Sequence, residues 1–229
     1  MVKRQRLGGY FAIISAVMLV LVMVLTQTVV VQGEDVYEQT VLSLAAYPVL
    51  NWVLLLLGAF AMILVCWTVE AIDTRLRLGN PKMSSNVSRF AYLHLFSYTF
   101  YMLLPAAALH DLANKDKNIE EALATVQPMI ELGLVISVFS SICLSIWLIQ
   151  IGTLILKTGL FSKMLGIFTT IISTIVLFSG AYEALYGRGS AIGIISSILT
   201  FVGAFVIWKI WIGVELLKKT ANIDKIELC

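Results

Sequence analysis

The chain has 229 residues, of which 59% are hydrophobic and only 13% charged, and its mean hydropathy is +0.93. Soluble domains carry about 25% charged residues, so this composition is typical of a protein embedded in a lipid bilayer. The formal net charge of +2 gives no sign of a nucleic-acid partner, and we expect none.

Six stretches without Asp, Glu, Lys or Arg are long enough to cross a bilayer, which takes about 20 apolar residues. The sequence therefore predicts an all-α polytopic membrane protein, a single domain formed by a bundle of six transmembrane helices. The predicted spans cover approximately residues 8–32, 48–68, 89–110, 128–156, 163–183 and 190–216. The first span follows a basic segment, but its apolar core is about twice as long as that of a secretory signal, so we expect a retained helix.

Basic residues alternate between the two sides of the predicted bundle. Lys and Arg accumulate in cytoplasmic loops because they resist translocation. With the N-terminus inside, 13 basic residues fall on the cytoplasmic side and 3 on the other, and every loop follows the alternation. We therefore expect a multi-pass protein of the cell membrane, a prokaryotic plasma membrane, with its N- and C-termini in the cytoplasm.

Between the first two spans, the segment from Val36 to Tyr47 follows an acidic break. It is predicted to form a helix at the outer interface, because the uncharged run is longer than one span needs. Pro48 is expected in the first turn of the second span, where a proline is best tolerated.

The outer loop 110–127 carries apolar residues at helical spacing, among them Ile119 and Leu123. This spacing predicts a short amphipathic helix on the membrane surface. Pro128 is then expected to open the fourth span at its first turn.

The third span contains the candidate binding face. His94, Tyr98, Tyr101 and Pro105 fall at i, i+4, i+7 and i+11, so they share one side of a helix. His94 lies about 7 Å on the cytoplasmic side of the middle of its span. Together with Asn51 of the second span, the histidine and the two tyrosines are the predicted ligand-binding residues.

Two interpretations of the polar side chains remain open. His94 is either a neutral imidazole bonded to a neighbouring hydroxyl or carbonyl group, or a residue that contacts a ligand or titrates. Tyr98 and Tyr101 are either packing aromatics or part of a substrate cage. Lys209 is expected to extend to the inner surface, so it needs no role.

Small residues recur at helical spacing in the last three spans and predict close packing among these helices. Such residues let backbones approach in lipid, where no hydrophobic force drives helices together. The predicted packing residues are Ser137, Ser141, Ser145, Gly166, Gly180, Gly193 and Gly203.

Several chemistries find no support in the sequence. The cysteines Cys66, Cys143 and Cys229 form no disulfide framework or metal motif. A haem bound by two histidines needs them on facing helices, whereas His94 and His110 lie on one helix, about 24 Å apart. We expect no catalytic residues, no metal site and no cofactor, and an enzyme is the less favoured class.

Residues 147–167 contain a recognisable hairpin pattern, WLIQIGTLILKTGLFSKMLGI. An apolar helix ends in Gly-x-Leu, a short basic turn follows, and a basic residue before Leu-Gly opens the next helix. The pattern is carried by Gly152, Leu154, Lys157, Lys163, Leu165 and Gly166. It resembles a family of small uncharacterised bacterial six-span membrane proteins, which often have a proline where this chain has Ser162. The resemblance implies a six-span fold and no particular activity.

These observations lead to two main functional hypotheses. The first is a non-catalytic accessory or scaffold subunit of a membrane assembly, or a homo-oligomer, whose partners are the lipid bilayer and other membrane subunits or copies of itself. The second is a transporter or binding protein for a small neutral or lipid-like molecule, with a pocket around His94. A third, an enzyme acting on lipid or quinone, would need a second ionisable group beside His94.

Overall fold

The computed structural model describes residues 2–33, 36–83, 86–112, 119–186 and 191–218. Every regular element in these ranges is a helix, so the prediction of an all-α protein is confirmed for them. In chain order the elements are α1 (Val2–Val29), α2 (Val36–Ala46), α3 (Pro48–Gly79), α4 (Asn86–Leu112), α5 (Ile119–Thr158), α6 (Lys163–Tyr186), α7 (Ala191–Thr200), the π-helix η1 (Phe201–Ile207) and α8 (Trp208–Leu217).

Within the described ranges, five helical segments are long and apolar enough to cross a membrane. They are Lys3–Val29, Pro48–Gly79, Val126–Thr158, Lys163–Tyr186 and Ala191–Leu217. The last of them comprises α7, η1 and α8 in direct succession. These lengths and compositions are those of an integral membrane protein.

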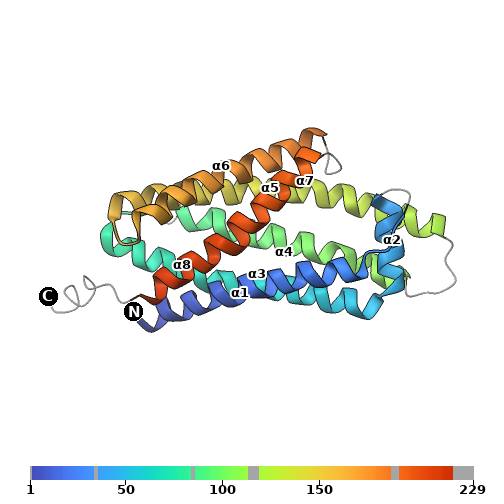
Figure 1. The fold of residues 1–229 in the computed structure, drawn as a ribbon, viewed down its shortest axis with the longest axis horizontal. Coiled ribbons are helices and arrows are strands. Elements are labelled where there is room, and N and C mark those ends of the chain that lie inside the picture. The colour runs from blue at the N-terminus through green and yellow to red at the C-terminus, as the bar shows by residue number, and fades with distance from the viewer. Residues whose placement is uncertain (1, 34–35, 84–85, 113–118, 187–190, 219–229) are drawn as a thin grey trace.

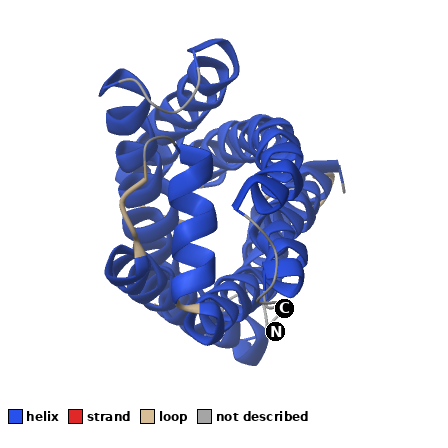
Figure 2. Ribbon diagram, turned by 90° about the vertical axis from the view of Figure 1, so that its right-hand side faces the viewer, coloured by secondary structure: helices blue, strands red, loops and turns tan. Residues whose placement is uncertain are grey.

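The long helices lie side by side and form one bundle (Figure 1). Helix α1 packs between α3 and α8, α4 packs between α3 and α5, and α6 packs against α5 and α7. Helix α2 instead lies across one end of the bundle, as the end-on view shows (Figure 2). The helix predicted for residues 36–47 is thus present, and it caps the bundle where α5 begins.

The opposite end of the bundle, here called the inner end, collects the helix ends that border basic residues. The start of α1, the end of α3, the start of α4, the α5–α6 hairpin and the end of α8 all lie there (Figure 1). We use the name inner end for this side throughout, because it carries the residues predicted to be cytoplasmic.

A tight turn joins α5 to α6. Gly159 has a φ of +63°, a left-handed conformation that residues with a Cβ rarely adopt, and its amide donates to the Ile155 carbonyl at 3.1 Å. The Ser162 hydroxyl accepts a 3.3 Å hydrogen bond from the Leu165 amide, as a helix N-cap does. Ser162 therefore caps the start of α6.

Three boundaries differ from the sequence predictions. Pro128 does not open a helix but lies inside α5, and residues from Ile119 onward belong to that helix rather than to a separate surface helix. Leu123 and Val126, near the start of α5, pack against Val41 and Leu44 of α2. This contact continues the helix past the proline. Helix α3 also runs on to Gly79, beyond the predicted end of its span.

Arg75 ties three parts of the inner end together. Its guanidinium donates hydrogen bonds to the carbonyls of Glu215 in α8 at 2.5 Å and Leu160 in the hairpin at 2.8 Å. The same group lies 4.4 Å from the centre of the Phe161 ring. Arg75 is 2% exposed, and these contacts bind two of its guanidinium nitrogens, while its Nε is buried without a hydrogen-bond partner within the described residues.

Candidate functional site

The structure encloses His94 at the contact between α4 and α5. The imidazole is 3% exposed, and its Nδ1 lies 2.7 Å from the Ser140 hydroxyl and 3.1 Å from the Ser140 carbonyl. The Ser140 hydroxyl in turn donates to the His94 carbonyl at 3.3 Å. The predicted contact of a buried imidazole with a neighbouring hydroxyl and carbonyl group is therefore present.

These distances indicate which ring nitrogen carries the proton. If Nδ1 carried a lone pair instead of a proton, this lone pair would face those of the Ser140 carbonyl oxygen at 3.1 Å, which is repulsive. With the proton on Nδ1, the ring donates to Ser140 and the serine hydroxyl remains free to donate to the His94 carbonyl. In this tautomer of the neutral ring Nε2 carries no proton, so it is a hydrogen-bond acceptor.

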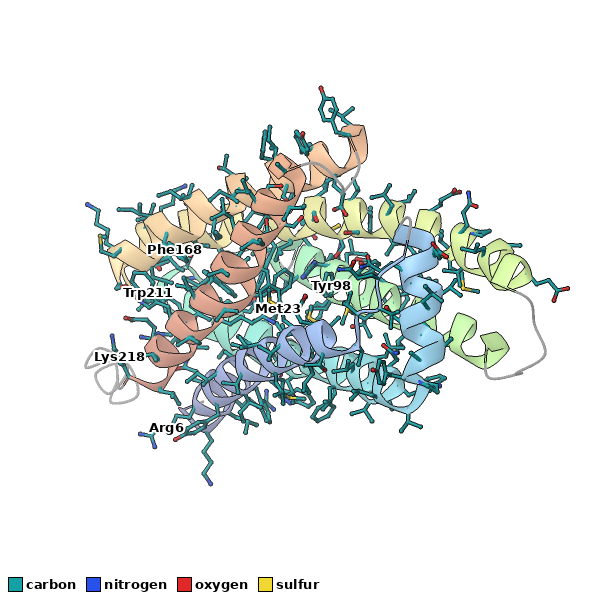
Figure 3. The ribbon with its side chains drawn as sticks, turned by 45° about the vertical axis from the view of Figure 1, so that its right-hand side comes forward. Arg6, Met23, Tyr98, Phe168, Trp211 and Lys218 are labelled. Atoms are coloured by element: carbon teal, nitrogen blue, oxygen red, sulfur yellow. The ribbon has the colours of Figure 1, made fainter. Side chains whose placement is uncertain are left out.

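Aromatic side chains extend from the His94 ring toward the bundle interior. The Tyr98 ring lies 5.7 Å from the imidazole and 5.6 Å from the Tyr101 ring, measured between ring centres. Phe205 of η1 stacks on Tyr98 at 5.3 Å and lies 5.9 Å from His94. Figure 3 shows Tyr98 within the bundle rather than on its outer surface. The predicted face of α4 thus contacts the last membrane-spanning segment through Phe205.

Lys209 completes this group of residues. The residue is 3% exposed, and its Nζ lies 5.2 Å from the centre of the Phe205 ring. Nζ is buried and has no hydrogen-bond partner within the described part of the chain. The expectation that Lys209 reaches the inner surface is wrong, because α8 directs the side chain into the bundle.

His94 and Lys209 lie at the same depth. His94 comes eight positions after Asn86 at the start of α4, and Lys209 comes eight positions before Leu217 at the end of α8. At a helical rise of about 1.5 Å per residue, each lies about 12 Å from the inner end of its helix. We call His94, Tyr98, Ser140, Phe205 and Lys209 the inner-half cluster.

The π-helix η1 positions two members of the cluster. A π-turn inserts one extra residue per turn and rotates the side chains that follow, and such turns are frequent at functional sites. The Trp208 amide bonds to the Gly203 carbonyl five residues earlier. A Cβ on Gly203 would collide with the Ile172 side chain, so α6 and η1 approach closely at this glycine.

Trp208 anchors the end of the π-helix. Its indole Nε1 donates a 2.9 Å hydrogen bond to the Thr169 hydroxyl of α6, and its ring packs edge-on against Trp147 of α5 at 5.4 Å. Both contacts are buried and hold α8 against the α5–α6 hairpin. Phe205 and Lys209, on either side of Trp208 in the chain, are thereby oriented toward α4.

Asn51 lies away from the inner-half cluster. Its amide donates to the Ser43 carbonyl at 2.9 Å and to the Tyr47 carbonyl at 3.0 Å, and so fastens α2 to the start of α3. The structure therefore brings together His94, Tyr98 and Tyr101 of the predicted site but not Asn51. The side chain of Pro105 lies outside those described.

The predicted packing residues lie mainly between α5 and α6. The Ser145 hydroxyl donates to the Ser173 carbonyl at 2.8 Å, and a Cβ on Gly180 would lie 2.8 Å from the Ser141 Cβ. Ser137 contacts a Glu183 carboxylate oxygen at 3.5 Å. Gly166 faces Ile155 and Leu156 across the hairpin, Gly193 is buried in α7, and Gly203 lies in η1.

Sequence reasoning missed Ser140, Phe205 and the orientation of Lys209. A serine or phenylalanine in an apolar span carries no signal that separates it from packing residues. Lys209 did carry one, since an ionisable residue inside a predicted span indicates a functional site by default. Only the π-turn before it decides that the side chain turns inward.

Comparison with protein-family models, with curated proteins and with solved structures finds no match for this chain.

Proposed function

We propose that this chain is a multi-pass membrane protein that binds a lipid-like molecule at the inner-half cluster, as a binding or transport protein. The observation that carries the proposal is the meeting of His94 and Lys209 at one Phe205 ring, deep between α4 and α8. Ligand sites inside helical bundles combine apolar and aromatic walls with a few convergent polar groups, and this cluster has that composition.

The proposal includes six membrane spans, with α4 as the third, and both termini in the cytoplasm. Helix α4 has 27 residues and packs between α3 and α5, which are both long enough to span. The split of 13 basic residues to 3 supports a cytoplasmic inner end. The membrane in question would be the plasma membrane of a prokaryote.

Native purification followed by mass spectrometry of bound lipids and small molecules tests the binding function. The wild-type protein is expected to retain a molecule in stoichiometric amount, and His94→Ala together with Tyr98→Phe is expected to lose it. The matched control is Tyr92→Phe, since Tyr92 lies on the same helix but is 43% exposed and faces outward. Equal retention by all three proteins would contradict a site at the cluster.

The accessory-subunit hypothesis has a different structural basis. Helix α1 carries an outward surface of exposed apolar side chains, which either lipid or a partner helix can cover. The residues are Leu7, Tyr10, Ile14, Val17, Leu21 and Val24. The same purification distinguishes the two functions, because a subunit would co-purify with a stoichiometric protein partner, whereas a binding protein would run alone with its ligand.

The enzyme hypothesis required a second ionisable group beside His94, and Lys209 is such a group. An imidazole acceptor and an amine donor can stabilise charge or move a proton on a bound lipid or quinone. Enzymatic activity would be detected as chemical conversion of the recovered ligand during incubation with the protein. Recovery of the ligand unchanged would leave binding or transport as the function.

A further inference from the structure

Lys209 is the member of the inner-half cluster whose buried amine has no hydrogen-bond partner within the described part of the chain. The backbone of Lys209 lies about 12 Å from the inner end of its helix, and its Nζ is buried and has no hydrogen-bond partner within the described residues. Arg75, another buried basic residue, differs because two of its guanidinium nitrogens donate to carbonyl groups and only its Nε lacks a partner within the described residues. Lys209 therefore has donors available for a molecule that is not part of this chain.

The energies involved favour an external partner of opposite charge. An ammonium inside a membrane-spanning segment is unfavourable when it has left water without gaining a partner of opposite charge. The Phe205 ring, whose centre lies 5.2 Å from Nζ, offsets only part of this cost by a cation–π interaction. The remainder is offset if an anionic group binds the ammonium, because charge-assisted hydrogen bonds are about twice as strong as neutral ones.

We propose that the lipid-like molecule bound at the inner-half cluster carries a single carboxylate, which Lys209 holds as an ion pair; this inference rests on the proposed function above. One carboxylate neutralises one ammonium, whereas a dianion would leave a buried negative charge beside a neutral imidazole. A long-chain carboxylate of the fatty-acid type has this head, and its apolar tail matches the aromatic and aliphatic surroundings of the cluster.

His94 adds no charge to the site and does not itself bind the carboxylate. Because its Nδ1 proton is engaged by Ser140, Nε2 accepts a hydrogen bond and cannot donate one to the carboxylate. A hydroxyl or water beside the head group could donate to Nε2. Phe205 contacts both the imidazole and the amine.

The test measures equilibrium binding of two probes with the same chain, palmitate and cetyl alcohol, to the full-length protein in phosphatidylcholine nanodiscs. Palmitate is expected to bind the wild type at least about ten-fold tighter than the alcohol. Lys209→Met is expected to reduce palmitate affinity to that of the alcohol, and Lys209→Arg to retain most of the difference. Lys157→Met, a change at an exposed lysine of α5, is the control and should match the wild type.

The outcomes separate this inference from the proposed function. If both probes bind the wild type equally and His94→Ala weakens both, the site is real but is not selective for anions, and the inference is overturned. If palmitate binds Lys209→Met as tightly as the wild type, the lysine only fills space and the inference is again overturned. If neither probe binds in a way that His94→Ala changes, the proposed function fails as well. The wild-type comparison of the two probes decides the inference even if Lys209→Met does not fold.

Discussion

The guanidinium of Arg75 donates a 2.5 Å hydrogen bond to the carbonyl of Glu215, a residue 140 positions later in the chain. This bond joins α3 to the last turn of α8, and a second one joins Arg75 to Leu160 in the hairpin. One side chain thus bridges carbonyls that the ends of α5 and α8 leave without helical donors nearby. The inner-half cluster lies deeper in the bundle than these contacts of Arg75, farther from the inner end.

Replacing Arg75 by lysine should destabilise the bundle despite the conserved charge. An ammonium cannot span both carbonyls in the planar geometry of a guanidinium, so at least one is left buried without a donor. The free energy of unfolding is expected to fall by about 2 kcal/mol, measured by thermal unfolding in detergent. The control is Arg77→Lys, whose guanidinium is partly exposed and binds Asp73 one turn away on the same helix and the single carbonyl of Met83. This pair is worth about 0.5 kcal/mol, and equal losses in both variants would contradict a special role for Arg75.

Thr169→Val should loosen the contact between α6 and α8. The valine keeps the shape of threonine but removes the acceptor for the Trp208 indole, leaving a buried N–H group unsatisfied at a cost of about 1–3 kcal/mol. We expect a lower unfolding temperature and a changed tryptophan emission spectrum. Thr174→Val provides the matched control, since Thr174 is exposed and bonds only to the backbone of its own helix. No difference between the two variants would show that the indole bond is dispensable.

Close packing should matter more than hydrogen bonding between α5 and α6. A Cβ on Gly180 would lie 2.8 Å from the Ser141 Cβ, so Gly180→Leu must force the helices apart and is expected to cost more than about 2 kcal/mol. Ser145→Ala removes the bond to the Ser173 carbonyl, and such interhelical bonds average about 0.6 kcal/mol in lipid. Thermal unfolding of both variants in one detergent gives the comparison. A larger loss in Ser145→Ala would reverse the order of the two contributions.

The proposed membrane topology predicts a labelling pattern for single cysteines. In a variant without Cys66, Cys143 and Cys229, a cysteine replacing Lys82 precedes α4, and one replacing Lys117 follows it. If α4 spans the membrane, a thiol reagent that cannot cross it should label position 117 in intact cells and position 82 only after lysis. Labelling of both positions from the same side would show that α4 does not cross.

Much of the fold was predictable from the uncharged runs alone. A lipid environment requires every backbone group to be bonded within its own segment, so an apolar run of about 20 residues has few alternatives to a helix. This constraint explains why the described elements agree with the predicted spans to within a few residues at most ends. It does not act at Pro128, where contacts with α2 continue α5 past a residue that usually opens a helix.

The candidate site was predictable only on the α4 side. The spacing of His94, Tyr98 and Tyr101 places them on one face of any helix, because helical periodicity is a local property. Which residues they meet depends on contacts between distant segments, and the hydrogen bond from His94 to Ser140 joins residues 46 positions apart. The resemblance to a six-span family stays a prediction, since it concerns the hairpin sequence and no relative was found.

The sequence by itself thus determined that the chain is helical, apolar enough for a membrane and polarised by its basic residues, because these properties follow from composition and local spacing. The tertiary structure alone decided that Lys209 is enclosed beside His94 instead of reaching the inner surface. That difference arises from the π-turn at η1, which rotates the last span by its extra residue, and from the contacts of Trp208 with Thr169 and Trp147, which hold the rotation in place.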